Sequence, residues 1–339
     1  MLEPFSDLET APFLGGENPG SLAVILCHFN PCLYRNPVAN LRRVLRWLGG
    51  AGVAAYAVEL RCGKSLSCAP VLPTNSKRVL QLSSEDVFFR KENLWNIAAA
   101  LVPRRIEKFL FLDADVLLED RRWFAQIEAA LDEYNLVQPF SRAVWLDSRG
   151  APYREKFSSA FAWRSGWPDA ASGKAYHAGF SVALRRDCWQ SAGGHFNGVL
   201  GEGASAMMAA AMGQAEMMSP YFQSISKDLA REYHRWAESF RRSISGKIGF
   251  LDASLNHLWH GHTAGRKYIW YRNADDPAVS ERMTWLRGFE PSIHLQAREP
   301  YGLIEWSDRA RSTRQDMISS VEAYFGGRNE DEWFESQST

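Results

Sequence analysis

The chain has 339 residues, 46% of them hydrophobic, and its 39 basic residues balance its 39 acidic ones. This length and apolar content suffice to bury one large core, and the charge balance argues against a dedicated nucleic-acid binder, which needs a basic excess to neutralise phosphates. The five cysteines include no Cys-x-x-Cys pair, so they predict neither a zinc site nor a disulfide framework. The acidic first residues and the lack of an apolar run of roughly 20 residues lead us to expect a cytoplasmic protein.

Residues 21–142 alternate between strand and helix patterns. After an irregular lead-in over 1–20, the apolar run 22–26 predicts a strand buried on both faces, residues 38–48 have helical spacing, and 53–60 predict a second strand. Further patterns indicate a helix over 91–101, a buried strand over 108–112, a helix around 124–131 and a strand over 136–139. Such alternation predicts parallel strands with right-handed crossovers, and thus a doubly wound, Rossmann-like α/β half.

The second half, 143–270, is more mixed. Residues 141–176 are loop-like, 178–184 predict a strand, and a short helix precedes a glycine-rich stretch over 193–203. A long amphipathic helix covers 229–240, and a strand-like segment over 248–260 ends in histidines. Residues 271–339 form a C-terminal extension whose tail, from about 311, is a charged helix. We expect one compact unit.

Two carboxylates, Asp113 and Asp115, directly follow the buried strand 108–112. In doubly wound sheets the ligand lies beyond the carboxyl ends of the strands. Hard oxygen ligands at that position suit Mn²⁺ or Mg²⁺ bound to a diphosphate. The alternative is structural, an aspartate at a strand end that caps the next helix.

Three histidines, His257, His260 and His262, follow in the second half. If they lie on one strand, His260 and His262 share a face and His257 points away. A neutral imidazole is a good further ligand for Mn²⁺. We therefore predict His260 as the third metal ligand, with His257 as the runner-up and His262 as another substitute.

The glycine-rich stretch contains one carboxylate, Glu202, just before a predicted helix over 204–212. A carboxylate held over an acceptor hydroxyl can act as a general base. An equally good explanation is a flexible loop with a glutamate favoured by the helix dipole.

Strand–Asp-x-Asp, a glycine-rich acidic loop before a helix, and a late histidine together resemble the GT-A glycosyltransferases over residues 22–270. The segments 177–180 (His-Ala-Gly-Phe), 201–203 (Gly-Glu-Gly) and 259–261 (Trp-His-Gly) are similar to those of bacterial and phage-encoded members. The resemblance implies a nucleotide-sugar donor, UDP favoured, bound by 21–142, and an acceptor bound by 143–270. It implies that Phe29, Asn30 and Glu59 lie near the nucleoside. Arg90, Lys91, Asn96 and Asp113 are implied to lie near the diphosphate or the sugar, and Gly179 and Phe180 along the sugar cleft.

One departure concerns the catalytic base. Family members carry an aspartate shortly after the glycines, where this chain has Ala204 and Ser205. Glu202 either substitutes for it or the base is absent, which leaves open a retaining enzyme, a weakened one, or a non-catalytic binding protein of the same fold. A nucleotidyltransferase is disfavoured because residues 27–32 contain no glycine, and a serine hydrolase because residues 179–183 lack the second glycine of the nucleophile elbow.

The acceptor is either a glycan or a hydroxymethylated pyrimidine in DNA, which would have to be flipped out of the duplex. The aromatic segment 161–167 could stack on a base or on a sugar. Charge neutrality favours the glycan, and no obligate protein partner is evident.

Overall fold

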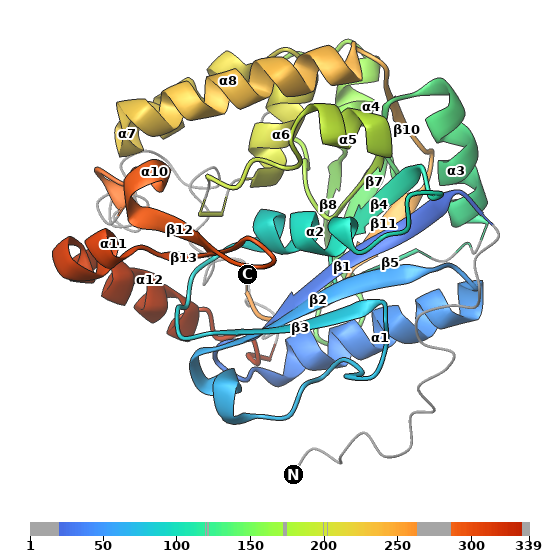
Figure 1. Ribbon diagram of the computed structural model, residues 1–339. Helices are drawn as coiled ribbons and strands as arrows, with labels where there is room; N and C mark the ends of the chain where they lie inside the picture. Colours follow the sequence, from blue (N-terminus) through green and yellow to red (C-terminus); the bar gives the residue numbers. More distant parts are fainter. Residues whose placement is uncertain are drawn as a thin grey trace, which may run out of the picture.

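The computed structural model describes residues 20–118, 120, 122–171, 175–198, 200–201, 203–262 and 286–333. Its centre is a seven-stranded sheet (Figure 1). The strands are, in spatial order, β10 (Ile248–Phe250), β6 (Leu136–Gln138), β9 (Ser181–Arg185), β4 (Lys108–Leu112), β1 (Leu22–Phe29), β2 (Ala55–Cys62) and β3 (Val79–Ser84). Strand β9 is antiparallel to both neighbours, and the other adjacent strands are parallel. The predicted mixed α/β class with a mostly parallel sheet is confirmed.

Helices cover both faces of this sheet because its inner strands are apolar on both sides. In β1, Val24 and Leu26 belong to one hydrophobic cluster, and Ala23 and Ile25 to the other. The first cluster is covered by α1 (Arg35–Ala51) and α3 (Trp123–Glu133). The second is covered by α2 (Lys91–Ala100), α5 (Arg186–Ser191), α6 (Gly203–Ala211) and α8 (Lys227–Ile244). This two-sided burial matches the expectation for continuous apolar strands.

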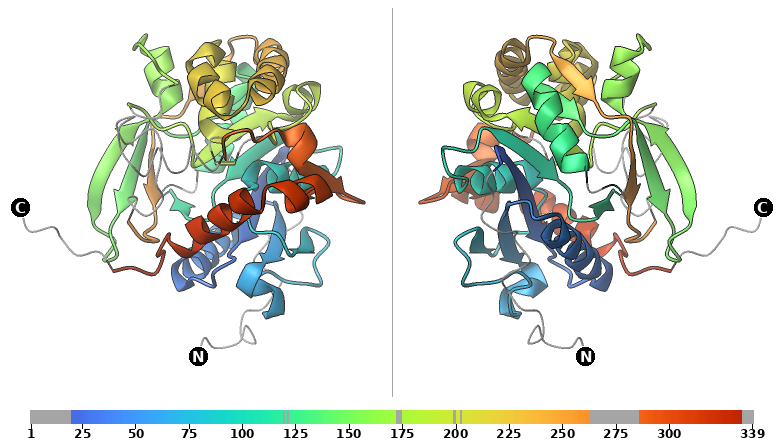
Figure 2. Two further views of the ribbon diagram at one scale, coloured as in Figure 1. Left: turned by 90° about the vertical axis from the view of Figure 1, so that its left-hand side faces the viewer. Right: turned by 90° about the vertical axis from the view of Figure 1, so that its right-hand side faces the viewer.

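A second sheet stands along one side of the molecule (Figure 2). Its order is β5 (Val116–Leu117), β11 (Ser254–His257), β7 (Arg142–Leu146) and β8 (Pro152–Phe157). The prediction that residues 141–176 are loop-like was therefore wrong, since this range contains β7, β8 and α4 (Ser159–Arg164). Strand β8 is an edge strand that is mostly exposed and polar, so it lacks the apolar signature of a buried strand. The segment 248–260 is also two strands, β10 and β11, which belong to different sheets.

The remaining elements pack around these two sheets. They are η2 (Gly63–Ser67), η3 (Ala215–Met218), α7 (Ser219–Ile225), α10 (Pro291–His294), β12 (Leu295–Arg298), β13 (Leu303–Trp306), α11 (Asp308–Thr313) and α12 (Gln315–Gly326). Strands β12 and β13 pair antiparallel and form a hairpin. This hairpin contacts α2, because the backbone N–H of Ile304 donates to Asn93 Oδ1 at 3.0 Å. The tail is helical, as predicted, and α12 buries one apolar side in the core. Within the described ranges, every helix is too short or too polar to cross a bilayer.

Candidate metal and donor site

A cavity of about 260 Å³ lies where the carboxyl ends of β1 and β4 meet the second sheet. Its lining brings together residues from β1, the turn after β4, the start of α2, the segment before β9 and the end of β11. The predicted Phe29, Asn30, Lys91, Asp113, Asp115, Gly179, Phe180 and His260 all line it. The ends of parallel strands thus open onto one cavity, as the doubly wound topology requires.

The turn after β4 carries Asp115 to the histidines. The chain passes from β4 into β5, and β5 pairs antiparallel with β11, so that Val116 lies opposite His257. The backbone N–H of Leu258 donates to the Asp115 carbonyl at 2.8 Å, which ends β11 and turns the chain. His257 and His260 consequently face the same point, with their Nε2 atoms 3.0 Å apart. The expectation that His257 points away from His260 was wrong, because the strand stops at His257.

Asp115, His257 and His260 form a group that fits a cation. Their ligand atoms all lie within 4.8 Å of one another. Asp115 Oδ2 is 2.9 Å from His260 Nε2 and 3.7 Å from His257 Nε2. Asp115 Oδ1 is buried and has no hydrogen-bond partner among the described residues. A buried carboxylate oxygen without a donor is costly unless a cation or proton meets it, so the donor set suits a divalent ion.

The charge of Asp115 supports the same conclusion. Burial alone would raise its pKa, but the imidazoles of His257 and His260 outweigh burial and hold the pKa well below its ordinary value. The carboxylate is therefore ionised at neutral pH. The third histidine, His262, packs edge-on against Trp259 at 5.0 Å and is not part of the group.

Asp113 has a different partner. Lys91 Nζ, at the start of α2, lies 3.0 Å from Asp113 Oδ1 and 3.3 Å from Oδ2. Burial would lower the pKa of Lys91, but Asp113 and Glu92 outweigh it and raise that pKa above its usual value. The ammonium group is thus a fixed positive charge beside the candidate metal site. The role of Asp113 as a metal ligand stays a prediction.

An aromatic wall closes the cavity on the side of the second sheet. Phe180 has a φ of 70°, in the left-handed region that residues with a side chain rarely adopt. This conformation lays its ring flat on His257, with centroids 4.5 Å apart and an interplanar angle of 17°. Trp145 and His177 contact the same ring at 5.2 and 3.9 Å. Burial holds the pKa of His177 well below its ordinary value, so that imidazole is neutral. Strain retained at a cavity wall is typical of functional sites.

Three predicted donor contacts do not line the cavity. Glu59 accepts hydrogen bonds from the backbone N–H groups of residues 71 and 72, both at 2.7 Å. Arg90 donates to the carbonyl oxygens of Asp86 and Ile304. Asn96 bonds the backbone of His195 with both its amide atoms. Each of these side chains therefore bonds to the protein's own backbone and not to groups in the cavity.

Two further predicted residues need comment. Asn30 lines the cavity, but its amide donates to the Tyr34 carbonyl and accepts from the Tyr34 N–H, so it shapes the turn after β1. Glu202 lies outside the described residues. The flanking glycines 201 and 203 do line the cavity.

Several lining residues were not foreseen. They include Glu92, Trp145, Arg154, His177, Arg328 and Glu330. Glu92 is 4% exposed, and burial raises its pKa against the opposing effect of Lys91. Its position next to Lys91 in the same helical turn was the one available signal. His177 belongs to the segment 177–180 that carries the resemblance, but it was given no role there. The others come from segments interpreted as loop or charged tail, where the sequence pattern carries no distance information.

No family model matches the chain, and no curated protein does. Among solved structures, it is similar to glucosyl-3-phosphoglycerate synthase from Mycobacterium tuberculosis in complex with Mn²⁺, UDP and glucosyl-3-phosphoglycerate (10% identity, 85% of this chain and 88% of that chain, TM-score 0.40). It is also similar to the catalytic domain of Drosophila β1,4-galactosyltransferase 7 in complex with xylobiose (11%, 86% and 96%, TM-score 0.35). A third similar structure is described as a putative nucleotide-diphospho-sugar transferase from Desulfovibrio desulfuricans (8%, 77% and 93%, TM-score 0.31).

Proposed function

We propose that this protein is a metal-dependent glycosyltransferase of the GT-A type, which moves a sugar from a nucleoside diphosphate, UDP favoured, to an acceptor hydroxyl. One observation carries the proposal: Asp115, His257 and His260 converge at the end of β4, inside a cavity, with Asp115 Oδ1 unsatisfied. A carboxylate and two imidazoles at the carboxyl-terminal edge of the parallel strands suit a cation that binds a diphosphate. Two nitrogen ligands favour Mn²⁺ over Mg²⁺, which prefers oxygen.

The residues around this centre have complementary roles. Asp115, His257 and His260 would hold the ion, which supplies charge neutralisation for the leaving diphosphate when bound. Lys91 adds a second fixed positive charge on the donor side, held in place by Asp113 at 3.0 Å. Phe29 and the turn braced by Asn30 form the opposite wall, where a nucleoside would lie.

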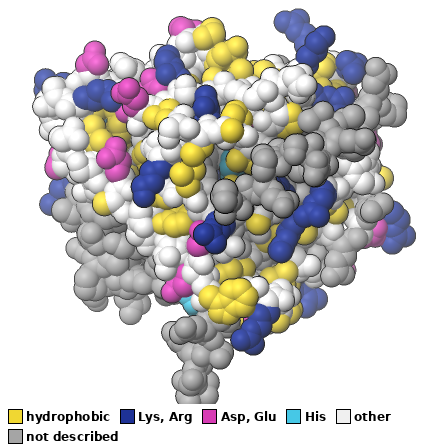
Figure 3. Space-filling view, turned by 90° about the horizontal axis from the view of Figure 1, so that it is seen from below, with side chains coloured by type: hydrophobic (Ala, Val, Ile, Leu, Met, Phe, Trp, Pro, Cys, Tyr) yellow, Lys and Arg dark blue, Asp and Glu magenta, His cyan; other side chains and the backbone are white. Residues whose placement is uncertain are grey.

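The acceptor belongs on the side of the aromatic wall formed by Trp145, His177 and Phe180. We favour a glycan over a hydroxymethylated pyrimidine in DNA. On the face shown in Figure 3, Lys and Arg side chains are interspersed with acidic and apolar ones, whereas a DNA-binding face needs concentrated positive charge. The aromatic segment 161–167 contributes no residue to the cavity lining: Phe161 stacks on Phe157 at 5.0 Å, and Trp167 packs edge-on against the same ring at 5.3 Å.

Glu202 remains our candidate for the general base, on the strength of its place between two cavity-lining glycines. The absence of an acidic residue at 204 or 205 supports the alternative of a non-catalytic binding protein. A nucleotidyltransferase of related fold is the third possibility. We also propose a cytoplasmic location, to which the five free cysteines are suited.

The test is the loss of metal-dependent donor turnover in Asp115→Ala. We expect the wild-type protein to hydrolyse or transfer from UDP-sugars only with Mn²⁺ or Mg²⁺. Removing Asp115 takes away the only carboxylate of the ligand group, so turnover should fall at least about 100-fold. Release of UDP measured with and without chelator gives the readout. The matched control is Asp169→Asn, an exposed aspartate that does not line the cavity.

Undiminished turnover in Asp115→Ala with chelator present would overturn the metal assignment. Donor binding without any turnover in the wild-type protein, across several nucleotide sugars, would favour the non-catalytic binder. Release of pyrophosphate from a nucleoside triphosphate would instead identify a nucleotidyltransferase.

A further inference from the structure

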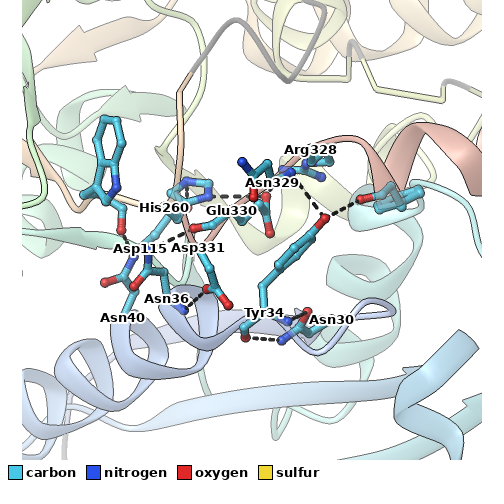
Figure 4. A network of polar contacts seen from close by, with 12 residues as sticks. Asn30, Tyr34, Asn36, Asn40, Asp115, His260, Arg328, Asn329, Glu330 and Asp331 are labelled. Carbon is cyan, nitrogen blue, oxygen red and sulfur yellow. Dashed lines mark hydrogen bonds and ion pairs between the residues drawn. The ribbon is translucent and has the colours of Figure 1, made fainter. Parts of the chain in front are cut away.

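Residues 328–332, which we call the C-terminal strap, run beside the first turn of α1 and beside His260 (Figure 4). Helix α1 has no side-chain cap of its own at Tyr34. Asp331 Oδ1 supplies it, accepting from the backbone N–H groups of Arg35 at 2.6 Å and Asn36 at 2.9 Å. The Asn36 amide in turn donates to the Glu330 carbonyl at 2.9 Å. The strap is therefore fixed to the start of α1 through unpaired N–H groups that every helix must satisfy.

The strap also interlocks with the turn that follows β11. Trp259 Nε1 donates to the Glu332 carbonyl at 2.6 Å. Gly261 has a φ of 89°, and a Cβ at this position would lie 2.6 Å from the Asn329 carbonyl oxygen. Only glycine permits this approach of the two backbones. The strap is thus held against the segment that carries His260.

This arrangement places Glu330 on the outer side of His260. Its carboxylate is buried, and Oε1 lies 3.4 Å from His260 Nδ1 and 2.5 Å from Arg328 Nη2. The opposite ring nitrogen, Nε2, faces Asp115 at 2.9 Å. A proton on Nδ1 donated to Glu330 leaves the Nε2 lone pair directed at the cation position. Metal-bound histidines typically donate their second N–H to a carboxylate in this way.

We propose that Glu330 is a positioning residue of the metal centre, delivered by the docked strap, which orients His260 for the cation. The inference rests on the metal site of the proposed function. A purely structural explanation also exists, in which Glu330 serves only to pair with Arg328 and hold the strap in place. The two explanations differ for a Glu330 variant whose strap stays in place: metal affinity falls if Glu330 orients His260, and it is unchanged if Glu330 only pairs with Arg328.

The experiment measures Mn²⁺ affinity without any nucleotide sugar, from the electron paramagnetic resonance signal of free Mn²⁺. We expect Glu330→Ala to weaken binding about tenfold or more, the usual effect of losing such a carboxylate. Glu330→Gln should lose less, because its amide oxygen still accepts from Nδ1. Glu332→Ala is the matched control, since that side chain is exposed and the residue holds the strap through its backbone N–H and carbonyl, and it should bind like the wild type.

A double-mutant cycle tests the route. Asp331→Ala loosens the strap and should weaken Mn²⁺ binding in the wild-type background, but not further in Glu330→Ala. Thermal unfolding without metal checks that each variant folds. If Glu330→Ala does not fold, the Mn²⁺ affinity of Glu330→Gln is compared with that of the wild type instead. Wild-type Mn²⁺ affinity in a folded Glu330 variant would overturn the inference but not the proposed metal centre. The same holds if the two single-variant losses of affinity multiply in the double variant. A wild-type protein that binds no Mn²⁺ would overturn the metal centre and the inference together.

Discussion

His195 is a buried imidazole on the face of the sheet opposite α1. It is 3% exposed, its ring meets Phe111 edge-on at 4.3 Å, and its Nε2 has no hydrogen-bond partner within the described ranges. Burial lowers its pKa from 6.5 to about 3. In the unfolded chain the same group takes up a proton below pH 6.5, whereas the folded protein keeps it neutral down to about pH 3. Its contribution to stability is therefore present above about pH 6.5 and is lost as the pH falls.

We predict that His195 alone lowers the free energy of unfolding by about 2 kcal/mol between pH 7 and pH 5. His195→Phe, a ring of similar size without a proton site, should reduce this pH dependence by that amount. Urea unfolding at the two pH values measures it. An unchanged pH dependence in His195→Phe would contradict the assignment.

At the residue scale, the sequence predicted which residues lie at the end of a strand, but not which groups their side chains contact. Asp113 and Asp115 reach the cavity because they follow an apolar strand, which the sequence displays directly. Arg90 and Asn96 were expected to face the donor from α2, the helix that precedes this strand, yet they bond to the backbone of Ile304 and His195. Those partners are far away in sequence, so nothing local to the two residues indicates them.

At the element scale, α2 and α6 meet at a point where glycine is required. Glu92, near the start of α2, lies against Gly203, the first residue of α6, and a Cβ on Gly203 would collide with the Glu92 carboxylate. Both residues line the cavity. The carboxylate cannot swing away freely because Glu92 is buried.

Gly203→Ala should therefore lower the free energy of unfolding by about 1–3 kcal/mol, the usual cost of overpacking. The cost should shrink in a Glu92→Ala background, where the colliding atoms are gone. Chemical unfolding of the wild type, both single variants and the double variant gives the coupling free energy. Gly326→Ala in α12 is the matched control, because its φ is not left-handed and a Cβ there would meet nothing within 4 Å. Additive costs at 92 and 203 would refute the contact.

The elements that sequence patterns located best are strands buried on both faces and helices with regularly spaced apolar residues. Strands β1 and β4 and helices α2 and α8 agree with their predicted ranges to within a few residues. The second sheet was missed because β7 and β8 have exposed positions and because β11 pairs with β5 and β7, which lie far away in the chain. This sheet brings His257 to Asp115, so missing it also led to the wrong orientation of the histidines.

At the scale of the whole molecule, charge bears on the acceptor. The 39 basic and 39 acidic residues cancel, and the face in Figure 3 mixes both signs. A DNA substrate would have to be held mainly through its phosphates, which requires many basic contacts. A neutral glycan needs only aromatic and hydrogen-bonding groups, which the wall of Trp145, His177 and Phe180 provides.

We predict that label from a panel of radiolabelled nucleotide sugars appears in simple glycosides and not in DNA. The panel pairs each donor with glycosides, plain DNA and hydroxymethylated DNA, with Mn²⁺ present. Asp115→Ala, which should transfer to none of them, separates enzymatic transfer from background. Label in DNA that depends on the hydroxymethyl group would reverse the acceptor assignment.

The pairing of β5 with β11 has a consequence for folding rates. Asp115 and the histidines come from opposite ends of a long loop of chain, whose closure costs entropy before any contact between them can form. A cation that joins them contributes little to a transition state in which this loop is still open. A cation bound at the proposed site should therefore slow unfolding and leave the folding rate nearly unchanged, which would prolong the lifetime of the folded protein.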